Sequence, residues 1–469
     1  MDGTVDVAVG GGGISGLAAA NKLREVALGL SVAVLEAGPR PGGVLGTVRR
    51  DGFLIEQSAD SFITNVPWAI DLCRRLGLGD DLVATDPNHR RSFVVRKGRL
   101  EPIPDGLVVM APSRIGPMVK TRILGAGGKL RLALERVLPR GDGADESLAS
   151  FARRRFGRQA YDRLIQPLVG GMYTGDPERL SVKATMPRFL EMEQNHGSLI
   201  KAMRAAGEAG GGTTQGSGAR YGLFAGLSEG MSMLVDALAA RVPIRLHARV
   251  DRLEGDDDGW RLTVGGEPLK ARSVLIAAPP GTAAGLLRGI DAPAARLIEG
   301  IPGSTSAVVS LGYRRDRIAH PLDGFGFVVP FVEDRRILSG SFSSVKFAGR
   351  APEGSALIRV FMGGAKHPEL VELDDAELVR IASAELAELL GARGEPDVAV
   401  VARWRGSMPQ YEVGHLDRIA TIADRVAAIP GLEVTGNWLA GVGVPACVKA
   451  GEDAAARIAA HHAETARRV

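Results

Sequence analysis

A glycine-rich turn near the start of the chain constrains the fold more than any other feature. The alternating run Val5 to Val9 is typical of a strand, and Gly11-x-Gly13-x-x-Gly16 follows it directly. A helix-like segment and a second buried-type strand, Ser31 to Glu36, come next, so this part of the chain predicts a βαβ unit. Glycines in such a turn let backbone N–H groups and the helix N-terminus meet a pyrophosphate.

Glu36 makes this interpretation more specific than a glycine turn alone. It closes the second strand about 20 residues after the turn, where a carboxylate can accept hydrogen bonds from ribose hydroxyls. We therefore expect a dinucleotide-binding fold.

Composition and charge exclude several classes of protein. The 469 residues carry a formal net charge of +4 with acidic and basic residues interspersed, so we expect no nucleic-acid partner. Cys73 and Cys447 stand far apart and outside any C-x-x-C, which favours neither a disulfide nor a metal site and indicates a reducing compartment. No leader sequence or membrane span is recognisable, so we expect a cytoplasmic protein, with peripheral attachment to the inner face of the cell membrane left open.

Further along, the pattern changes several times. Residues 105 to 193 have helical periodicity with caps, including the segment Asp145-Glu146-Ser147-Leu148, and Gly207 to Gly218 predicts a surface loop. Two strands, 249–253 and 260–264, are joined across an acidic run that we interpret as a hairpin turn; a metal loop is the alternative. Residues 273–279 predict a buried strand, residues 301–430 mix strands with helices, and a last helix is expected from about Ala450.

The residues after Glu36 identify a type of cofactor by resemblance. Glu36-Ala37-Gly38-Pro39-Arg40-Pro41-Gly42-Gly43 resembles the extended signature of the amine-oxidase-like flavoprotein superfamily, whose cofactor is FAD. Four later blocks resemble the oxygen-dependent protoporphyrinogen oxidase and coproporphyrinogen III oxidase family. They are Gly170 to Asp176 with Leu180-Ser181, Gly324 to Pro330, Arg403-Trp404 with Pro409-Gln410-Tyr411 and Gly414-His415, and Gly436-Asn437-Trp438 with Gly441 to Val444.

The resemblance implies an α/β plus α+β fold. A Rossmann-like FAD-binding domain would comprise residues 1–88, 245–282 and 431–469. A mostly helical insertion, membrane-contacting and pocket-lining, would comprise 89–210, and a mixed-sheet substrate domain 211–244 and 283–430.

The resemblance also implies the site residues. No protein residue is expected to act as a catalyst, because the flavin carries the chemistry. The expected cofactor contacts are Gly11, Gly13, Ile14, Ser15, Gly16, Glu36, Ala37, Arg40, Gly42, Gly43, Val250, Gly441, Val442, Gly443 and Val444. The expected substrate contacts are Arg91, Gly171, Phe325, Gly326, Val328 and Phe361, and no metal is expected.

One departure concerns the substrate carboxylates. Many family members have an arginine where this chain has Ser92, and Arg91, one position away, would point to the opposite face of a strand. Further departures are Val44, Ser58-Ala59 and Pro445-Ala446.

The family implies the oxidation of protoporphyrinogen IX to protoporphyrin IX, with six electrons passing to O₂ and three H₂O₂ formed, late in haem synthesis. The alternative is coproporphyrinogen III oxidase, which the segment Pro102 to Val109 resembles. More distant alternatives are a flavin amine oxidase and a non-catalytic FAD-binding protein. A homodimer and a hand-over of product to a ferrochelatase are further expectations of the resemblance.

Overall fold

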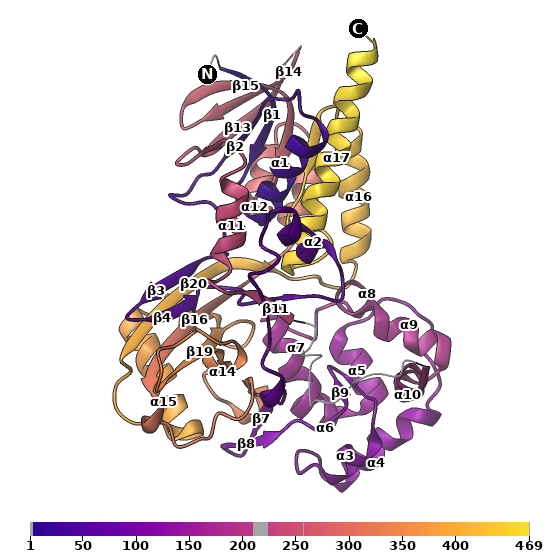
Figure 1. Ribbon diagram of the computed structural model, residues 1–469. Coiled ribbons are helices and arrows are strands. Elements are labelled where there is room, and N and C mark those ends of the chain that lie inside the picture. Colours follow the sequence, from indigo (N-terminus) through magenta and orange to yellow (C-terminus); the bar gives the residue numbers. More distant parts are fainter. Residues whose placement is uncertain (1–2, 210–223, 257, 469) are drawn as a thin grey trace.

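The computed structural model describes residues 3–209, 224–256 and 258–468 and places two seven-stranded sheets in different parts of the molecule (Figure 1). The predicted loop Gly207 to Gly218 lies outside the described residues from residue 210 onward. The first sheet runs in the order β12 (Ile244–Arg245), β2 (Val32–Leu35), β1 (Thr4–Gly10), β15 (Glu267–Ile276), β14 (Gly259–Val264) and β13 (Val250–Asp256), with β21 (Leu432–Val434) beside β15.

The pairing within this sheet confirms two predictions. β1 pairs in parallel with β2 and β15, as a βαβ unit requires, and β13 pairs with β14 as the antiparallel hairpin predicted around the acidic run. Among the described residues, no group of His, Cys, Asp and Glu side chains is suited to hold a metal ion.

Helices cover both faces of the first sheet because its strands are apolar on both sides. Val7 and Val9 pack in one cluster with residues of α1 (Ile14–Val26), α2 (Trp68–Arg75), α11 (Ser232–Ala239) and α17 (Val444–Arg468). Ala8 packs on the other side with residues of α12 (Pro280–Leu287), α13 (Ala292–Glu299) and α16 (His415–Ala427). This arrangement leaves the ends of the strands free to form a site.

The second sheet is mixed. Its order is β20 (Val398–Pro409), β16 (Gly303–Arg314), β19 (Ser355–Gly363), β18 (Ile337–Phe342), β17 (Gly326–Val328), β7 (Phe93–Arg96) and β8 (Arg99–Pro102). Phe93, Phe327 and Val360 pack in one cluster with residues of α15 (Asp375–Leu390), so α15 covers one face of this sheet. Two small sheets, β3 (Thr47–Arg50) with β4 (Phe53–Glu56), and β5 (Phe62–Ile63), β11 (Phe224–Leu227) and β6 (Leu82–Ala84), complete the strands used below.

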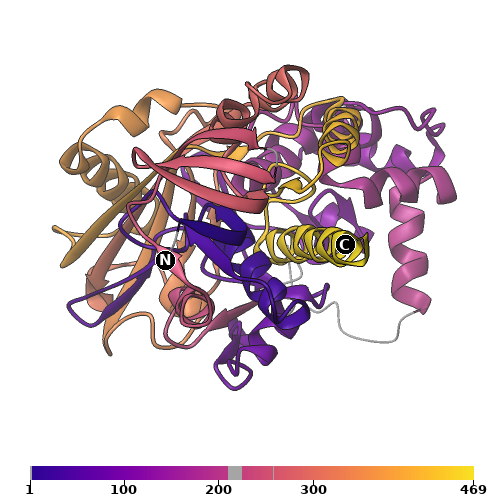
Figure 2. The same cartoon turned by 90° about the horizontal axis from the view of Figure 1, so that it is seen from above.

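A mostly helical part lies on the opposite side of the molecule from β16, β19 and α15 (Figures 1 and 2). After the short strands β9 (Leu107–Val108) and β10 (Ala111–Pro112) it contains α3 (Ile115–Lys120), α4 (Ala126–Ala133), α5 (Leu148–Phe156), α6 (Arg158–Ala160), α7 (Gln166–Tyr173), α8 (Val182–Thr185), α9 (Pro187–His196) and α10 (Leu199–Ala209). A helix cap does lie within the predicted segment Asp145 to Leu148, since the Ser147 hydroxyl accepts a hydrogen bond from the Ser150 N–H at the start of α5.

Three elements lie elsewhere than the expected domain ranges imply. β7 and β8 belong to the second sheet although they fall within residues 89–210, and α11, within residues 211–244, packs against α1. The mixed α/β fold is confirmed, while the domain boundaries stay a prediction. Of the helices that the structure describes, none is both long enough and apolar enough to span a membrane.

The helical part is held together by a buried charge cluster formed by Arg155, Glu135 and Glu193, all three fully buried. The Arg155 guanidinium donates to Glu135 Oε1 at 3.1 Å and to Glu193 Oε1 at 3.2 Å, and also to the carbonyls of Pro139 and Gly197 at 3.0 Å. Glu135 also accepts hydrogen bonds from the Ser198 hydroxyl and from the N–H groups that open α10. The cluster therefore links α5, α9 and α10.

This cluster predicts sensitivity to acid. Burial favours the neutral Glu193 carboxyl, but hydrogen bonds and charge from Arg154 and Arg155 outweigh burial and lower its pKa below the ordinary 4.5. Because the folded pKa is the lower one, the stabilisation is present above 4.5 and lost as the pH falls below it. We expect Glu193→Gln to flatten the fall of the thermal midpoint between pH 5 and pH 3, measured by circular dichroism; an unchanged slope would contradict this.

Candidate functional site

The predicted glycine turn lies between the end of β1 and the start of α1, and two of its glycines, Gly11 and Gly16, have no room for a side chain. Gly11 has φ +122°, and a Cβ there would lie 2.2 Å from the Ala277 carbonyl oxygen. A Cβ on Gly16 would lie 2.0 Å from the Gly11 carbonyl oxygen, so the turn packs against itself. Gly13 differs, because its Cβ would meet no atom within 4 Å. The space in front of Gly13 is therefore open.

The start of α1 has unused hydrogen-bond donors. Gly13 is the N-cap residue, no side chain caps the helix, and the first turn contains no acidic residue. Ile14 and Ser15 form that first turn. The free N–H groups and the positive end of the helix dipole suit a phosphate or another anion in the open space before Gly13.

Glu36 follows β2 and faces this turn. Its Oε2 accepts a hydrogen bond from the Gly12 N–H at 2.8 Å, and its Oε1 accepts one from the Gly38 N–H at 2.7 Å. A carboxylate has about four acceptor sites, so capacity remains for ribose hydroxyls. Val250, at the start of β13, lies against the base of the turn, 3.6 Å from a Cβ built on Gly10.

The second glycine pair packs against the first glycine turn. The Gly42 N–H donates to the Gly12 carbonyl at 2.7 Å, and a Cβ on Gly43 would lie 3.3 Å from Gly13 Cα. Arg40 fixes the loop, because its guanidinium donates to the carbonyls of Pro41, Gly43 and Leu45. The exposed Ala37 makes no hydrogen bond of its own toward the turn among the interactions of the described residues. Arg40 thus shapes the site through the backbone of the glycine pair.

The predicted C-terminal turn, Gly441 to Val444, leads into a helix that packs against α1. The last helix begins at Val444, earlier than the expected Ala450, because Pro445 is tolerated in a first helical turn. Near the start of α17, Cys447 hydrogen-bonds Ser15 of α1, and a Cβ on Gly451 would lie 2.2 Å from the Ser15 carbonyl oxygen. The first turn of α1 therefore packs against the first two turns of α17, and the two helices lie side by side (Figure 1).

A second wall comes from the face of the second sheet that α15 does not cover. Residues directly opposite on paired strands share a face, and the register places Val328 opposite Ser339 and Ser339 opposite Phe361. Gly326 lies two residues from Val328 on β17. A Cβ on Gly171 of α7 would lie 3.6 Å from Val328 Cγ1. The structure thus brings Gly171, Gly326, Val328 and Phe361 to one wall, and Phe325 is buried directly before it.

Arg91 is not part of this wall. It is exposed, forms an ion pair with Asp323, donates to the Asp323 carbonyl at 2.7 Å and lies over the ring of Phe93, whose side chain packs toward α15. Ser92 is buried, and Val94 of the following strand lies opposite Val328. The one-residue offset noted in the sequence therefore directs Arg91 to the other face of the sheet, away from Val328 and Phe361.

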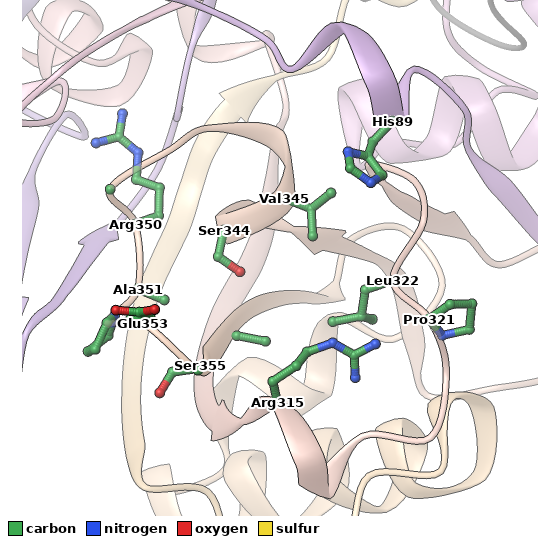
Figure 3. A pocket seen from close by; sticks show the side chains of 14 residues that line it. His89, Arg315, Pro321, Leu322, Ser344, Val345, Arg350, Ala351, Glu353 and Ser355 are labelled. Atoms are coloured by element: carbon green, nitrogen blue, oxygen red, sulfur yellow. The ribbon is translucent and has the colours of Figure 1, made fainter.

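A conspicuous cavity lies away from all these residues. It has a volume of about 270 Å³ and lies between Arg315, Leu322, Ser344 and the start of β19 (Figure 3). Arg315 is already engaged by the carbonyls of Ile318 and His320, and the Arg350 side chain points away from the cavity in the view. None of its lining residues is among the expected contacts, so we assign no role to it.

Comparison with known proteins identifies the family. The family model described as "Flavin containing amine oxidoreductase" matches residues 14–459. The chain belongs to this family. It is a flavin-dependent oxidoreductase.

Three similar proteins illustrate where the chain stands in this flavin family. It is 35% identical to coproporphyrinogen III oxidase of Bacillus subtilis, covering 97% of both chains, and 30% identical to chloroplastic protoporphyrinogen oxidase of Nicotiana tabacum, covering 97% of this chain and 85% of the other. A solved structure from Exiguobacterium sp. 255-15, described as a candidate protoporphyrinogen oxidase, superposes with a TM-score of 0.87 at 29% identity over 98% and 99% of the chains. The resemblance stated from the sequence is confirmed.

Proposed function

We propose that this chain is an FAD-dependent oxidase that converts coproporphyrinogen III to coproporphyrin III with O₂ as acceptor. The observation that carries the proposal is the wall of Gly171, Gly326, Val328 and Phe361. It is mostly apolar, and it comes from three elements: α7, and β17 and β19 of the second sheet. A flat macrocycle needs such a wall, with glycines where the ring approaches backbone.

The sequence analysis put protoporphyrinogen IX first, and the relatives favour the alternative. Coproporphyrinogen III oxidases from three bacteria are 32% to 35% identical to this chain, whereas the plant protoporphyrinogen oxidases are 30% identical. The motifs found in the sequence fit both enzymes. In the proposed site they surround the flavin, which both enzymes use, and the porphyrinogen macrocycle, which both substrates contain. The preference for coproporphyrinogen III is tested by kcat/KM for each substrate, and a higher value for protoporphyrinogen IX would reverse it.

The residues of the cofactor site suit FAD. The N–H groups at the start of α1 would bind the pyrophosphate, Glu36 the ribose, and the N-terminus of α17 would stabilise negative charge on the reduced ring. Bound FAD would supply the electron acceptor for the oxidation. An amine oxidase is the second candidate, since putrescine oxidase shares the fold with a TM-score of 0.69 at 19% identity. Trp438 is not available to form an aromatic cage around an amine, because it is fully buried and its indole N–H donates to the Ala278 carbonyl at 3.0 Å.

The wall predicts a substitution that separates substrate from cofactor. In the proposed site a leucine at Gly171 would project beside Val328 into the space for the macrocycle. We expect Gly171→Leu to keep its flavin and to raise KM for coproporphyrinogen III at least about tenfold, a loss of about 1.4 kcal/mol of binding. Porphyrin fluorescence measures the rate, and an unchanged KM would remove Gly171 from the site.

We further propose that α4 and the turn after it contact the inner face of the cell membrane. Leu130, Leu134 and Val137 are 65%, 44% and 75% exposed at helical spacing. The sequence between Asp105 and Glu135 has no acidic residue and carries Arg114, Lys120, Arg122, Lys129 and Arg131. Exposed apolar side chains with basic neighbours suit an anionic lipid surface. By contrast, Arg153, Arg154 and Arg155 all have acidic partners within the protein.

This contact predicts a loss of lipid binding on substitution. We expect flotation with phosphatidylglycerol vesicles to be lost when Leu130, Leu134 and Val137 are all replaced by serine, because the apolar anchor is removed. Leu28→Ser is the control, since Leu28 is 89% exposed on another part of the molecule. Equal flotation of both variants would contradict the assignment.

A further inference from the structure

The turn before α17 is fixed by two side chains from a different segment. Tyr411 follows β20, and His415 opens α16. Their rings stack, with centroids 4.1 Å apart and planes at 11°. The Tyr411 hydroxyl donates a hydrogen bond to the Asn437 carbonyl and accepts one from the Gly441 N–H at 2.8 Å. One buried hydroxyl therefore bridges both ends of the segment from Asn437 to Gly441.

His415 holds the middle of the same segment. Its Nε2 lies 3.1 Å from the Leu439 carbonyl oxygen, and since a carbonyl only accepts, Nε2 carries the hydrogen. The Asn437 side-chain amide donates to the Ser407 carbonyl at 3.1 Å. The segment is thus fixed at nearly every residue by groups outside it, with Tyr411 as the group that contacts Gly441 itself.

Gly441 transmits this constraint to α17. Its φ is +156°, and a Cβ there would lie 2.5 Å from Ala446 Cβ in the first turn of the helix. The backbone at Gly441 is therefore pressed against the start of α17, which lies beside the start of α1. Burial raises the pKa of the Tyr411 hydroxyl, so the hydroxyl keeps its proton and its donor role at neutral pH.

A cavity behind the stacked pair leaves room for the segment to move. Its volume is about 420 Å³, and Tyr411, His415, Leu439 and Ala440 line it from one side, with residues of α8 and α9 on the other. Protein interiors otherwise resist displacement because they are densely packed. If the hydrogen bond to Gly441 is lost, the segment can relax toward this cavity.

We propose that Tyr411, supported by His415, is a positioning residue for the flavin: it holds Gly441 to Val444, and with them the N-terminus of α17, at the place where the reduced flavin ring needs a positive partner. The inference rests on the proposed function, which puts the flavin ring at this turn. It adds a role for a residue that does not itself react.

Tyr411→Phe tests the inference, because it keeps the ring and the stack and removes only the hydroxyl. We expect the variant to bind FAD, to have a lower flavin reduction potential than the unmodified protein, and to lose about tenfold or more in kcat, as small misplacements in active sites do. KM for coproporphyrinogen III should stay within about twofold, since the substrate wall lies on other elements. The potential is measured by anaerobic reductive titration of the bound flavin.

Tyr313→Phe is the matched control. Tyr313, in the second sheet, is also fully buried, and the substitution removes a single hydrogen bond, from its hydroxyl to the Ser383 hydroxyl at 3.3 Å. Its flavin potential and kcat should equal those of the unmodified protein. His415→Phe, which keeps an aromatic ring but removes the donor to Leu439, should shift the potential in the same direction and gives the comparison if Tyr411→Phe does not fold.

The outcomes distinguish the positioning role of Tyr411 from the proposed oxidase function. If the unmodified protein oxidises coproporphyrinogen III but Tyr411→Phe and His415→Phe match Tyr313→Phe in potential and kcat, the positioning role is overturned and the proposed function stands. The same holds if the variants lose only thermal stability. If the unmodified protein binds flavin without oxidising a porphyrinogen, the proposed function is wrong, and the positioning role that rests on it is overturned with it.

Discussion

Replacing Gly13 with valine is expected to give a folded protein that contains no flavin. The Gly13 backbone, at φ −72° and ψ 175°, is open to any residue, and a Cβ there meets no protein atom within 4 Å. The added side chain would instead fill the open space before the N–H groups of α1, where the pyrophosphate would bind in the proposed cofactor site. We expect flavin content, read from the visible spectrum of the purified protein, to fall at least about 100-fold, the effect of about 2.7 kcal/mol.

Two further substitutions serve as comparisons for Gly13→Val. Gly29→Val, in the loop after α1, also places its Cβ in open space and should keep its flavin. Gly11→Val should destabilise the fold itself, because its Cβ would clash with the Ala277 carbonyl and its φ is positive. Full flavin occupancy in Gly13→Val would show that the cofactor lies somewhere else.

Replacing Arg155 with alanine is expected to lower the free energy of unfolding by about 3–5 kcal/mol. The change leaves the fully buried Glu135 without its cationic partner and leaves the fully buried Glu193 with Arg154 alone, and an uncompensated buried charge costs that much. Urea denaturation followed by circular dichroism measures the change, with the loss expected in the helical part.

Arg158→Ala is the control for Arg155→Ala. Its guanidinium is 87% exposed and pairs with Asp162 across one helical turn, so its loss should cost less than about 1 kcal/mol. Equal destabilisation by the two substitutions would mean that the buried cluster contributes no more than a surface pair.

The glycine turn, Glu36 and the hairpin around the acidic run could be predicted because each is specified by residues close together in sequence. Gly11 and Gly16 have no alternative in a turn this tight, and an alternating strand before them leaves little choice of element. The cap at Ser147 is local in the same sense. Such features depend on the backbone conformations that individual residues allow.

Features that depend on distant partners could not be predicted in this way. The run Arg153 to Arg155 looks like a solvated helix face, yet Arg155 is fully buried because Glu135 and Glu193 approach it from other helices. Tyr411 stood in a recognised block without a role, and only the fold brings its hydroxyl to Gly441. The start of α17 was missed because glycine and proline mask a helix that begins at Val444.

The most direct test of the proposed function is anaerobic mixing of the purified protein with coproporphyrinogen III while the visible flavin absorbance is followed. We predict that the flavin bleaches as it takes up two electrons, and that admitting air restores the flavin, forms peroxide and lets porphyrin fluorescence rise as the remaining electrons pass to O₂. A flavin that stays oxidised with coproporphyrinogen III and with protoporphyrinogen IX, but bleaches with a primary amine, would contradict the proposal and place the chain among the amine oxidases of its family.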